Sequence, residues 1–151
     1  MRKIVIVLAV LCLILTGCGG EKLSVPSPER VRVVNPMMQV ESLAEMEGYL
    51  DYAVPVLEKE VEKFIVLVID GYPQIGRVVY ADGGEFRIRY GTGDISGIYG
   101  GTEEKTEEIQ GVTVTFLIYD QIRYAIWEKA GFTCCLMGGE SLETEVASLI
   151  G

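Results

Sequence analysis

Histidine, the side chain that most often transfers protons in enzymes near neutral pH, is missing from all 151 residues of the chain. Its absence excludes Ser-His and Cys-His nucleophile pairs and every zinc site that uses an imidazole. Acid–base chemistry would therefore depend on carboxylates, and the pair Asp82 and Glu85 keeps that route open. The composition thus favours binding over catalysis.

Two of the four cysteines, Cys134 and Cys135, are neighbours in the sequence. Adjacent Cα atoms lie about 3.8 Å apart across a trans peptide, which is below the usual disulfide range of about 4.4–6.8 Å. In a strand, two successive side chains also point to opposite faces of the sheet. We therefore predict two free thiols that fill packing positions.

Two further segments contain residue types that bind ions. The glycine-rich stretch 91–97 leads into no helix pattern and lacks a Walker lysine, so Asp94 and Ser96 are interpreted as caps of a turn. The acidic run 103–108 does not have the spacing of an EF-hand loop, and on a strand only alternate carboxylates share a face. We interpret its four glutamates as a charged edge strand that blocks edge-to-edge pairing: Glu103, Glu104, Glu107 and Glu108. The sequence leaves cation binding open at both segments, but it predicts no metal site and no cofactor.

The elements that position these groups follow from hydrophobic periodicity. A capping box formed by Ser42 and Glu45 predicts a helix over 43–53, and Ser141 can cap a second helix at the end of the chain. Between them, alternation and turn residues predict strands over 64–69, 75–81, 85–90, 102–109, 112–119, 122–128 and 132–137. We therefore expect an α+β fold: an N-terminal helix, an antiparallel meander of about seven strands, and a C-terminal helix packed on a curved sheet.

Aromatic residues are frequent in the predicted strands. Most are expected to pack in the core, but aromatic side chains on an open concave face would suit a lipid, glycan or peptide ligand. Trp127, Tyr124 and Tyr90 are the candidates for such a ligand face. The sequence does not decide between this role and burial beneath a helix.

The first residues have the pattern of an export signal. Arg2 and Lys3 precede an uncharged apolar stretch, Ile4–Leu15, whose helical length of about 18 Å is too short for a hydrocarbon core of about 30 Å. The stretch ends in Leu15-Thr16-Gly17-Cys18, which resembles the lipobox of bacterial prolipoproteins. The resemblance implies cleavage before Cys18 by the lipoprotein-processing machinery and diacylglycerol on its thiol.

These patterns divide the chain into three parts. We expect a lipoprotein signal peptide at 1–17, a lipidated cysteine with a flexible tether at 18–34, and a single α+β domain at 35–151. Without Arg2 and Lys3, 11 Lys and Arg face 22 Asp and Glu, which gives a net charge of −11. Such a domain would repel nucleic acid and anionic headgroups. The expected location is the extracytoplasmic face of the cell membrane, reached through the lipid.

Several strings of the domain resemble a family of small Gram-positive lipoproteins with a C-terminal domain of unknown function. They cover about 35–151 and are Asn35-Pro36-Met37, Ser42-Leu43-Ala44-Glu45, 94–99, 111–115, Ala125-Ile126-Trp127, Gly131-Phe132 and Ser141-Leu142-Glu143. The resemblance implies a curved antiparallel sheet with flanking helices, similar to half of a lipoprotein-carrier barrel, and no catalytic residues. Related domains also form the outer part of anti-sigma-like membrane proteins. Segment 54–60 departs from the family and keeps only Pro55 of its usual link.

The sequence therefore predicts a lipid-anchored envelope protein whose domain binds an unknown envelope protein, peptide or ligand without catalysis. The alternative is a carrier- or sensor-like domain that holds an acyl ligand on its curved sheet.

Overall fold

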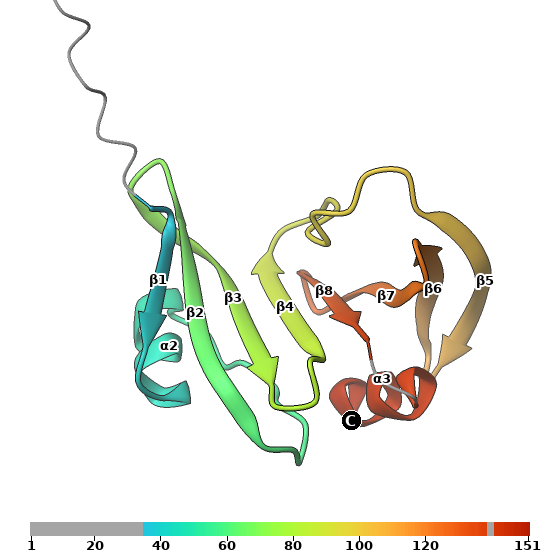
Figure 1. The fold of residues 1–151 in the computed structure, drawn as a ribbon, viewed down its shortest axis with the longest axis horizontal. Coiled ribbons are helices and arrows are strands. Elements are labelled where there is room, and N and C mark those ends of the chain that lie inside the picture. The colour runs from blue at the N-terminus through green and yellow to red at the C-terminus, as the bar shows by residue number, and fades with distance from the viewer. Residues whose placement is uncertain (1–34, 139–140) are drawn as a thin grey trace, which may run out of the picture. The chain divides into compact units, whose positions relative to one another are not determined.

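Antiparallel strands form the framework of the domain (Figure 1). The computed structural model describes residues 35–138 and 141–151. In these ranges eight strands make one open sheet, accompanied by two helices, α2 (Leu43–Leu50) and α3 (Leu142–Ile150). The strands are β1 (Met37–Val40), β2 (Val61–Ile69), β3 (Tyr72–Tyr80), β4 (Glu85–Tyr90), β5 (Thr102–Ile109), β6 (Val112–Tyr119), β7 (Ile122–Lys129) and β8 (Phe132–Met137). The α+β prediction is confirmed, with β1 as a strand that the sequence analysis did not include.

The strand order is β1-β2-β3-β4-β8-β7-β6-β5, so the sheet consists of two four-stranded meanders joined by β4 and β8. Between the meanders the chain must travel from β4 to the far edge of the sheet at β5. The loop 91–101 makes this connection, and Figure 1 shows it passing on the side of β6–β8 opposite α3. The loop and α3 therefore cover opposite faces of the same strands.

Four hairpins have two-residue turns whose central residues are both left-handed: Asp70-Gly71, Gln110-Gly111, Asp120-Gln121 and Ala130-Gly131. Turns of this kind match the twist of the flanking strands and fix their register. The strand predicted over 75–81 begins earlier than expected, because the turn ends at Gly71. Tyr72 and Pro73 belong to the start of β3. A register shift separates the pair of Pro73 and Val68 from the neighbouring pair of Ile75 and Leu67.

Helix α2 begins where the capping box predicts. The Ser42 hydroxyl accepts a hydrogen bond from the Glu45 N–H at 3.2 Å, and the Glu45 carboxylate accepts one from the Glu41 N–H at 2.8 Å. The helix ends at Leu50, three residues earlier than the predicted 53, because Asp51 adopts a left-handed conformation and donates its N–H to the Glu47 carbonyl. Asp tolerates this conformation better than most residues.

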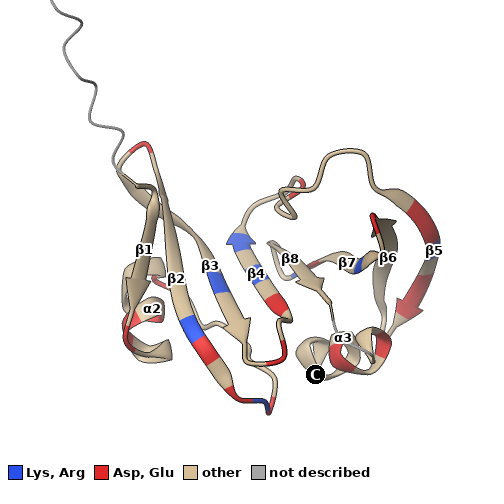
Figure 2. Cartoon of the chain, viewed as in Figure 1, with Lys and Arg blue, Asp and Glu red and all other residues tan. Residues whose placement is uncertain are grey.

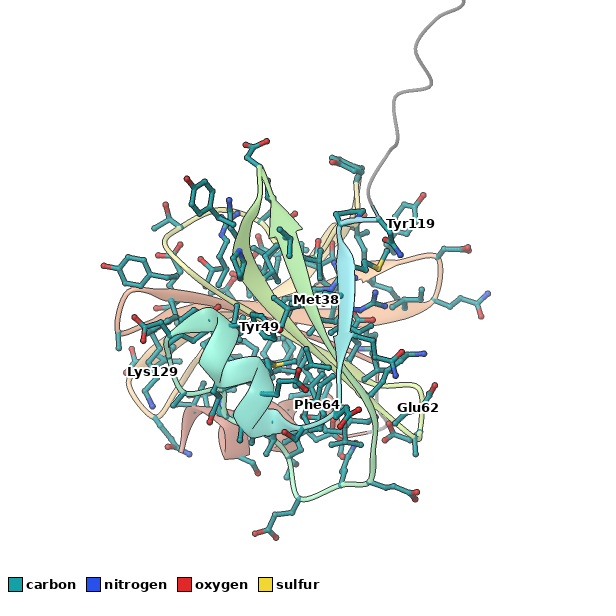
Figure 3. All side chains as sticks on the ribbon, turned by 90° about the vertical axis from the view of Figure 1, so that its left-hand side faces the viewer. Met38, Tyr49, Glu62, Phe64, Tyr119 and Lys129 are labelled. Atoms are coloured by element: carbon teal, nitrogen blue, oxygen red, sulfur yellow. The ribbon has the colours of Figure 1, made fainter. Side chains whose placement is uncertain are left out.

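Both helices pack against the same face of the sheet, and the C-terminal helix thus packs on the sheet as predicted. Helix α2 covers β1–β3 and α3 covers β7 and β8, and their buried side chains belong to one continuous core. Figure 3 shows α2 beside β1 and β2, and Met38 and Phe64 of these strands pack against the core. Gly76 of β3 allows the close approach of α2, because a Cβ atom there would lie 2.8 Å from Leu50 Cδ1.

The opposite face of the sheet has a smaller apolar cluster. Ile75, Tyr124 and Cys135 project from it and pack with Ile95 of the loop 91–101. The loop therefore acts as a cover over the central strands. Within the described ranges, neither helix has the length and apolar character needed to cross a bilayer.

Candidate functional site

A pocket of about 550 Å³ lies beside the ends of α2 and β4. Its volume falls within the range of about 300–1,000 Å³ that is usual for small-ligand sites. Aromatic and polar side chains line it together: Leu50, Asp51, Tyr52, Pro73, Gln74, Arg89, Tyr90 and Phe132. We treat this aromatic pocket as the candidate site.

Tyr52 lines the pocket directly after Asp51, the left-handed residue that ends α2. The Tyr52 hydroxyl donates to the Ile88 carbonyl at 3.2 Å and also lies 3.4 Å from the Gln74 carbonyl. Burial raises the pKa of Tyr52 to about 12, so the phenol stays protonated and remains a donor at physiological pH. Tyr52 thereby joins the end of α2 to β3 and β4.

Three aromatic rings form a row along the pocket. The rings of Tyr52 and Phe132 have centroids 4.9 Å apart, and those of Phe132 and Tyr90 are 5.4 Å apart, both in edge-to-face geometry. Such pairs contribute about 0.5–1.5 kcal/mol beyond the burial of area. Phe132 is half-buried between its neighbours, whereas Tyr90 remains 71% exposed. The row thus holds an exposed ring in a defined position.

The polar residues of the pocket balance in charge. Gln74 donates Nε2 to the Ile69 carbonyl at 3.3 Å, and Arg89 donates Nη2 to the Thr92 carbonyl at 2.5 Å. Asp51 is exposed beside them. With one carboxylate and one guanidinium among its lining residues, the pocket suits a ligand that is polar but carries no net charge.

The structure does not bring the three predicted ligand-face residues together. Tyr90 lines the pocket, but Trp127 is only 3% exposed and stacks on Phe86 in the helix-side core, with centroids 6.1 Å apart. Tyr124 is buried on the opposite face beneath the loop. Its hydroxyl lies so close to Gly101 that any side chain at position 101 would collide with it. Trp127 and Tyr124 therefore serve packing.

Two residues of the aromatic row, Tyr52 and Phe132, were not among the sequence candidates. Phe132 pairs directly with Tyr90 in the register of β4 and β8, a contact between strands that are 42 positions apart in the sequence. Alternation alone does not reveal such a pairing. Tyr52 lies outside any strand, so no periodic signal marks it.

The loop 91–101 confirms the interpretation of Asp94 and Ser96 as turn caps. Asp94 Oδ1 accepts from the Ser96 N–H at 2.7 Å, and Ser96 Oγ accepts from the Ile98 N–H at 3.1 Å. Arg87 Nη1 then donates to the carbonyls of Ile95 and Ser96 at 3.0 and 2.7 Å. These contacts hold the loop against the sheet.

The carboxylates Asp82 and Glu85 are each engaged by cations. Lys59 Nζ lies 2.7 Å from Asp82, and its hydrogen bond lowers the pKa of that carboxyl. Glu85 is buried between Arg77 and Arg87 and accepts from both. Carboxylates that are paired with cations in this way serve structural ion pairing.

The acidic run lies on β5, at the open edge of the sheet. Figure 2 shows the Asp and Glu residues of this strand as red segments. Arg123 Nε contacts Glu104 at 2.9 Å, and Lys105 contacts Glu107 at 2.9 Å. Among residues 35–138 and 141–151, no three Cys, Asp or Glu side chains gather as a metal site would require. The charged edge strand predicted from the sequence is therefore present.

Cys134 and Cys135 are free and buried. Cys134 faces the helix-side core and Cys135 faces the cluster beneath the loop, as strand alternation predicts. Burial raises the pKa of Cys134 to about 12 and also raises that of Cys135. Both groups are therefore protonated thiols of low reactivity at physiological pH.

Comparisons of the chain with models of known families, with curated proteins and with solved structures find no match. The protein is therefore classified by its own fold and pocket. It is an α+β domain with an open antiparallel sheet and an aromatic pocket where α2 and β4 end. The expected signal peptide, lipobox and tether, including Leu15, Thr16, Gly17 and Cys18, lie outside the described residues.

Proposed function

We propose that the chain is a cell-envelope lipoprotein, anchored through lipid on Cys18, whose domain at 35–151 binds a ligand or partner without turnover. The observation that supports this most is the aromatic pocket, in which Tyr90 is exposed but held in place by Phe132. A tyrosine fixed beside a pocket offers a large contact area at a low entropic cost, because it has few rotatable bonds.

The core does not require Tyr90. Its side chain lies at the end of β4 and is 71% exposed, whereas the preceding inward residues of this strand, Phe86 and Ile88, are buried. An exposed aromatic residue that borders a pocket is typical of a contact surface. This contrast along one strand favours a binding role for the ring.

Three observations support binding rather than catalysis. The chain has no histidine, Asp82 and Glu85 are engaged in ion pairs, and the thiols of Cys134 and Cys135 are buried and protonated. None of these groups has the combination of access and basicity that a nucleophile or a general base needs.

The alternative, a carrier that holds an acyl chain on the curved sheet, has less support. On the helix side, Trp127 is buried in the core that α3 covers, and on the other side Tyr124 is buried under the loop 91–101. An acyl chain would have to displace that loop, which Arg87 holds through two carbonyl groups.

Native mass spectrometry tests the proposal. The lipidated protein would be purified from its own cells in nanodiscs as wild type, Tyr90→Ala and the control Tyr99→Ala, since Tyr99 is 91% exposed and does not line the pocket. We expect a bound species on the wild type and on Tyr99→Ala that is lost from Tyr90→Ala. A bound species that persists on Tyr90→Ala, or a substrate that the protein converts to product, would refute the proposal.

A further inference from the structure

We infer that the aromatic pocket binds a neutral sugar ring of an envelope glycan, with the ring stacked on Tyr90. This inference rests on the proposed function and adds the chemical class of the ligand. It follows from the exposed ring of Tyr90, from the polar residues beside it, and from the charge of the pocket and of the domain.

The exposed ring is the first element. An aromatic face has a negative quadrupole, and the C–H groups on one side of a pyranose ring are weakly positive and apolar, so the two surfaces attract each other. Tyr90 is the only ring of the aromatic row that is largely exposed, and its contact with Phe132 fixes its orientation. A flat ligand can therefore lie against it without displacing the core.

The polar residues are the second element. Asp51, Gln74 and Arg89 line the pocket with a carboxylate, an amide and a guanidinium, and all three groups are planar and can form paired hydrogen bonds. Neighbouring hydroxyls on a sugar ring offer paired donors and acceptors at matching separation. A purely apolar ligand, such as an acyl chain, would cover the Asp51 carboxylate and the remaining donors and acceptors of Gln74 and Arg89 without offering them a partner, which is costly.

Charge distinguishes among the remaining ligands. The net charge of −11 calculated for residues 18–151 disfavours phosphates, nucleotides and anionic headgroups. A cationic peptide would be attracted by the domain as a whole, but at the pocket the charges of Asp51 and Arg89 offset each other, so no net negative charge attracts a cation there. A neutral sugar meets neither obstacle, and the pocket volume of about 550 Å³ is ample for one or two rings.

Fluorine NMR of the lipidated protein in nanodiscs tests this inference. All eight tyrosines would be replaced by fluorotyrosine, and their signals assigned with single Tyr→Phe variants. The probes are the neutral trisaccharides N,N′,N″-triacetylchitotriose and cellotriose, with sorbitol as a polyol that has no ring and a lysine-rich peptide as the cationic competitor. We expect a saturable shift of the Tyr90 signal with at least one trisaccharide, an unchanged Tyr99 signal, and no shift with sorbitol.

Variants then locate the binding. Tyr90→Ala should raise the Kd for the trisaccharide by about tenfold, equivalent to about 1.4 kcal/mol, and Asp51→Asn should also weaken binding. Tyr90→Trp, which keeps a stacking face, and the control Tyr99→Ala should bind as the wild type does. The melting temperature of each variant shows whether the domain remains folded.

The outcomes separate this inference from the proposed function. A Tyr90 signal that moves with the peptide but with neither trisaccharide overturns the sugar assignment and leaves the binding proposal standing. Sugar binding that is unchanged in Tyr90→Ala overturns the assignment of the site. If the species retained in native mass spectrometry also persists on Tyr90→Ala, the proposed function fails as well.

Discussion

Replacing Trp127 by alanine separates a packing role from a ligand-binding role for this side chain. Trp127 is 3% exposed, stacks on Phe86 and belongs to the core that the two helices cover. Removing a large buried aromatic side chain leaves a cavity and typically costs about 3–5 kcal/mol. A domain of this size has a total stability of about 5–15 kcal/mol, so the loss is a large fraction of it.

The melting temperature gives the corresponding assay. For a domain of 117 residues (35–151), a loss of 3–5 kcal/mol should lower Tm by about 10–20 °C, followed by far-UV circular dichroism because the variant lacks tryptophan. Trp127→Phe should lose less, and Tyr90→Ala, which loses only the contact with Phe132 worth about 0.5–1.5 kcal/mol, should lower Tm by about 2–6 °C. A Trp127→Ala protein that melts within a few degrees of the wild type would refute the packing assignment and restore Trp127 as a surface residue.

Further predictions concern charge, thiols and anchoring. Hydrogen bonding to Arg123, the largest cause, lowers the pKa of Glu143 to about 2 from its ordinary 4.5, so the pair stabilises the fold above pH 4.5 and this contribution is lost between pH 4.5 and 2. Because the pair is partly exposed, Glu143→Gln should cost at most about 1 kcal/mol at pH 7, and its urea-unfolding curve should converge with that of the wild type near pH 2; a constant difference would contradict the assignment. Cys134 and Cys135 should resist alkylation in the folded protein and both react once it is unfolded without reductant, whereas a chain two hydrogens lighter and unlabelled would mean a vicinal disulfide. Cys18→Ala should leave an uncut, unlipidated precursor, and normal processing with covalent lipid would disprove the lipobox interpretation.

Strand positions were largely predictable because alternation and turn residues act locally. The segments 85–90, 102–109, 112–119 and 132–137 form strands with the predicted bounds. Strand β1 was missed because its four residues, Met37–Val40, are too few to establish a period, and they become a strand only by pairing with β2. The early end of α2 depends on the left-handed conformation of the single residue Asp51. Because Asp is one of several residue types that tolerate this conformation, the sequence does not mark Asp51 as the end of the helix.

The site was less predictable than the fold because it depends on contacts between distant segments. Tyr90 and Phe132 meet only because β4 pairs with β8, and that pairing requires the chain to cross to β5 before it returns. Trp127 and Tyr124 have opposite parity in β7, so strand alternation already places them on different faces. What alternation cannot specify is the burial of both faces, which depends on α3 and on the loop 91–101.

Photo-crosslinking in intact cells tests the central claim, binding through the aromatic pocket of an anchored domain, most directly. The full chain would carry p-benzoylphenylalanine in place of Tyr90 or, as matched exposed controls, in place of Tyr99 or Tyr119, neither of which lines the pocket. We expect a specific envelope adduct from the Tyr90 position that is absent from both control positions. Equal yields from all three positions, or none from the Tyr90 position, would contradict the claim.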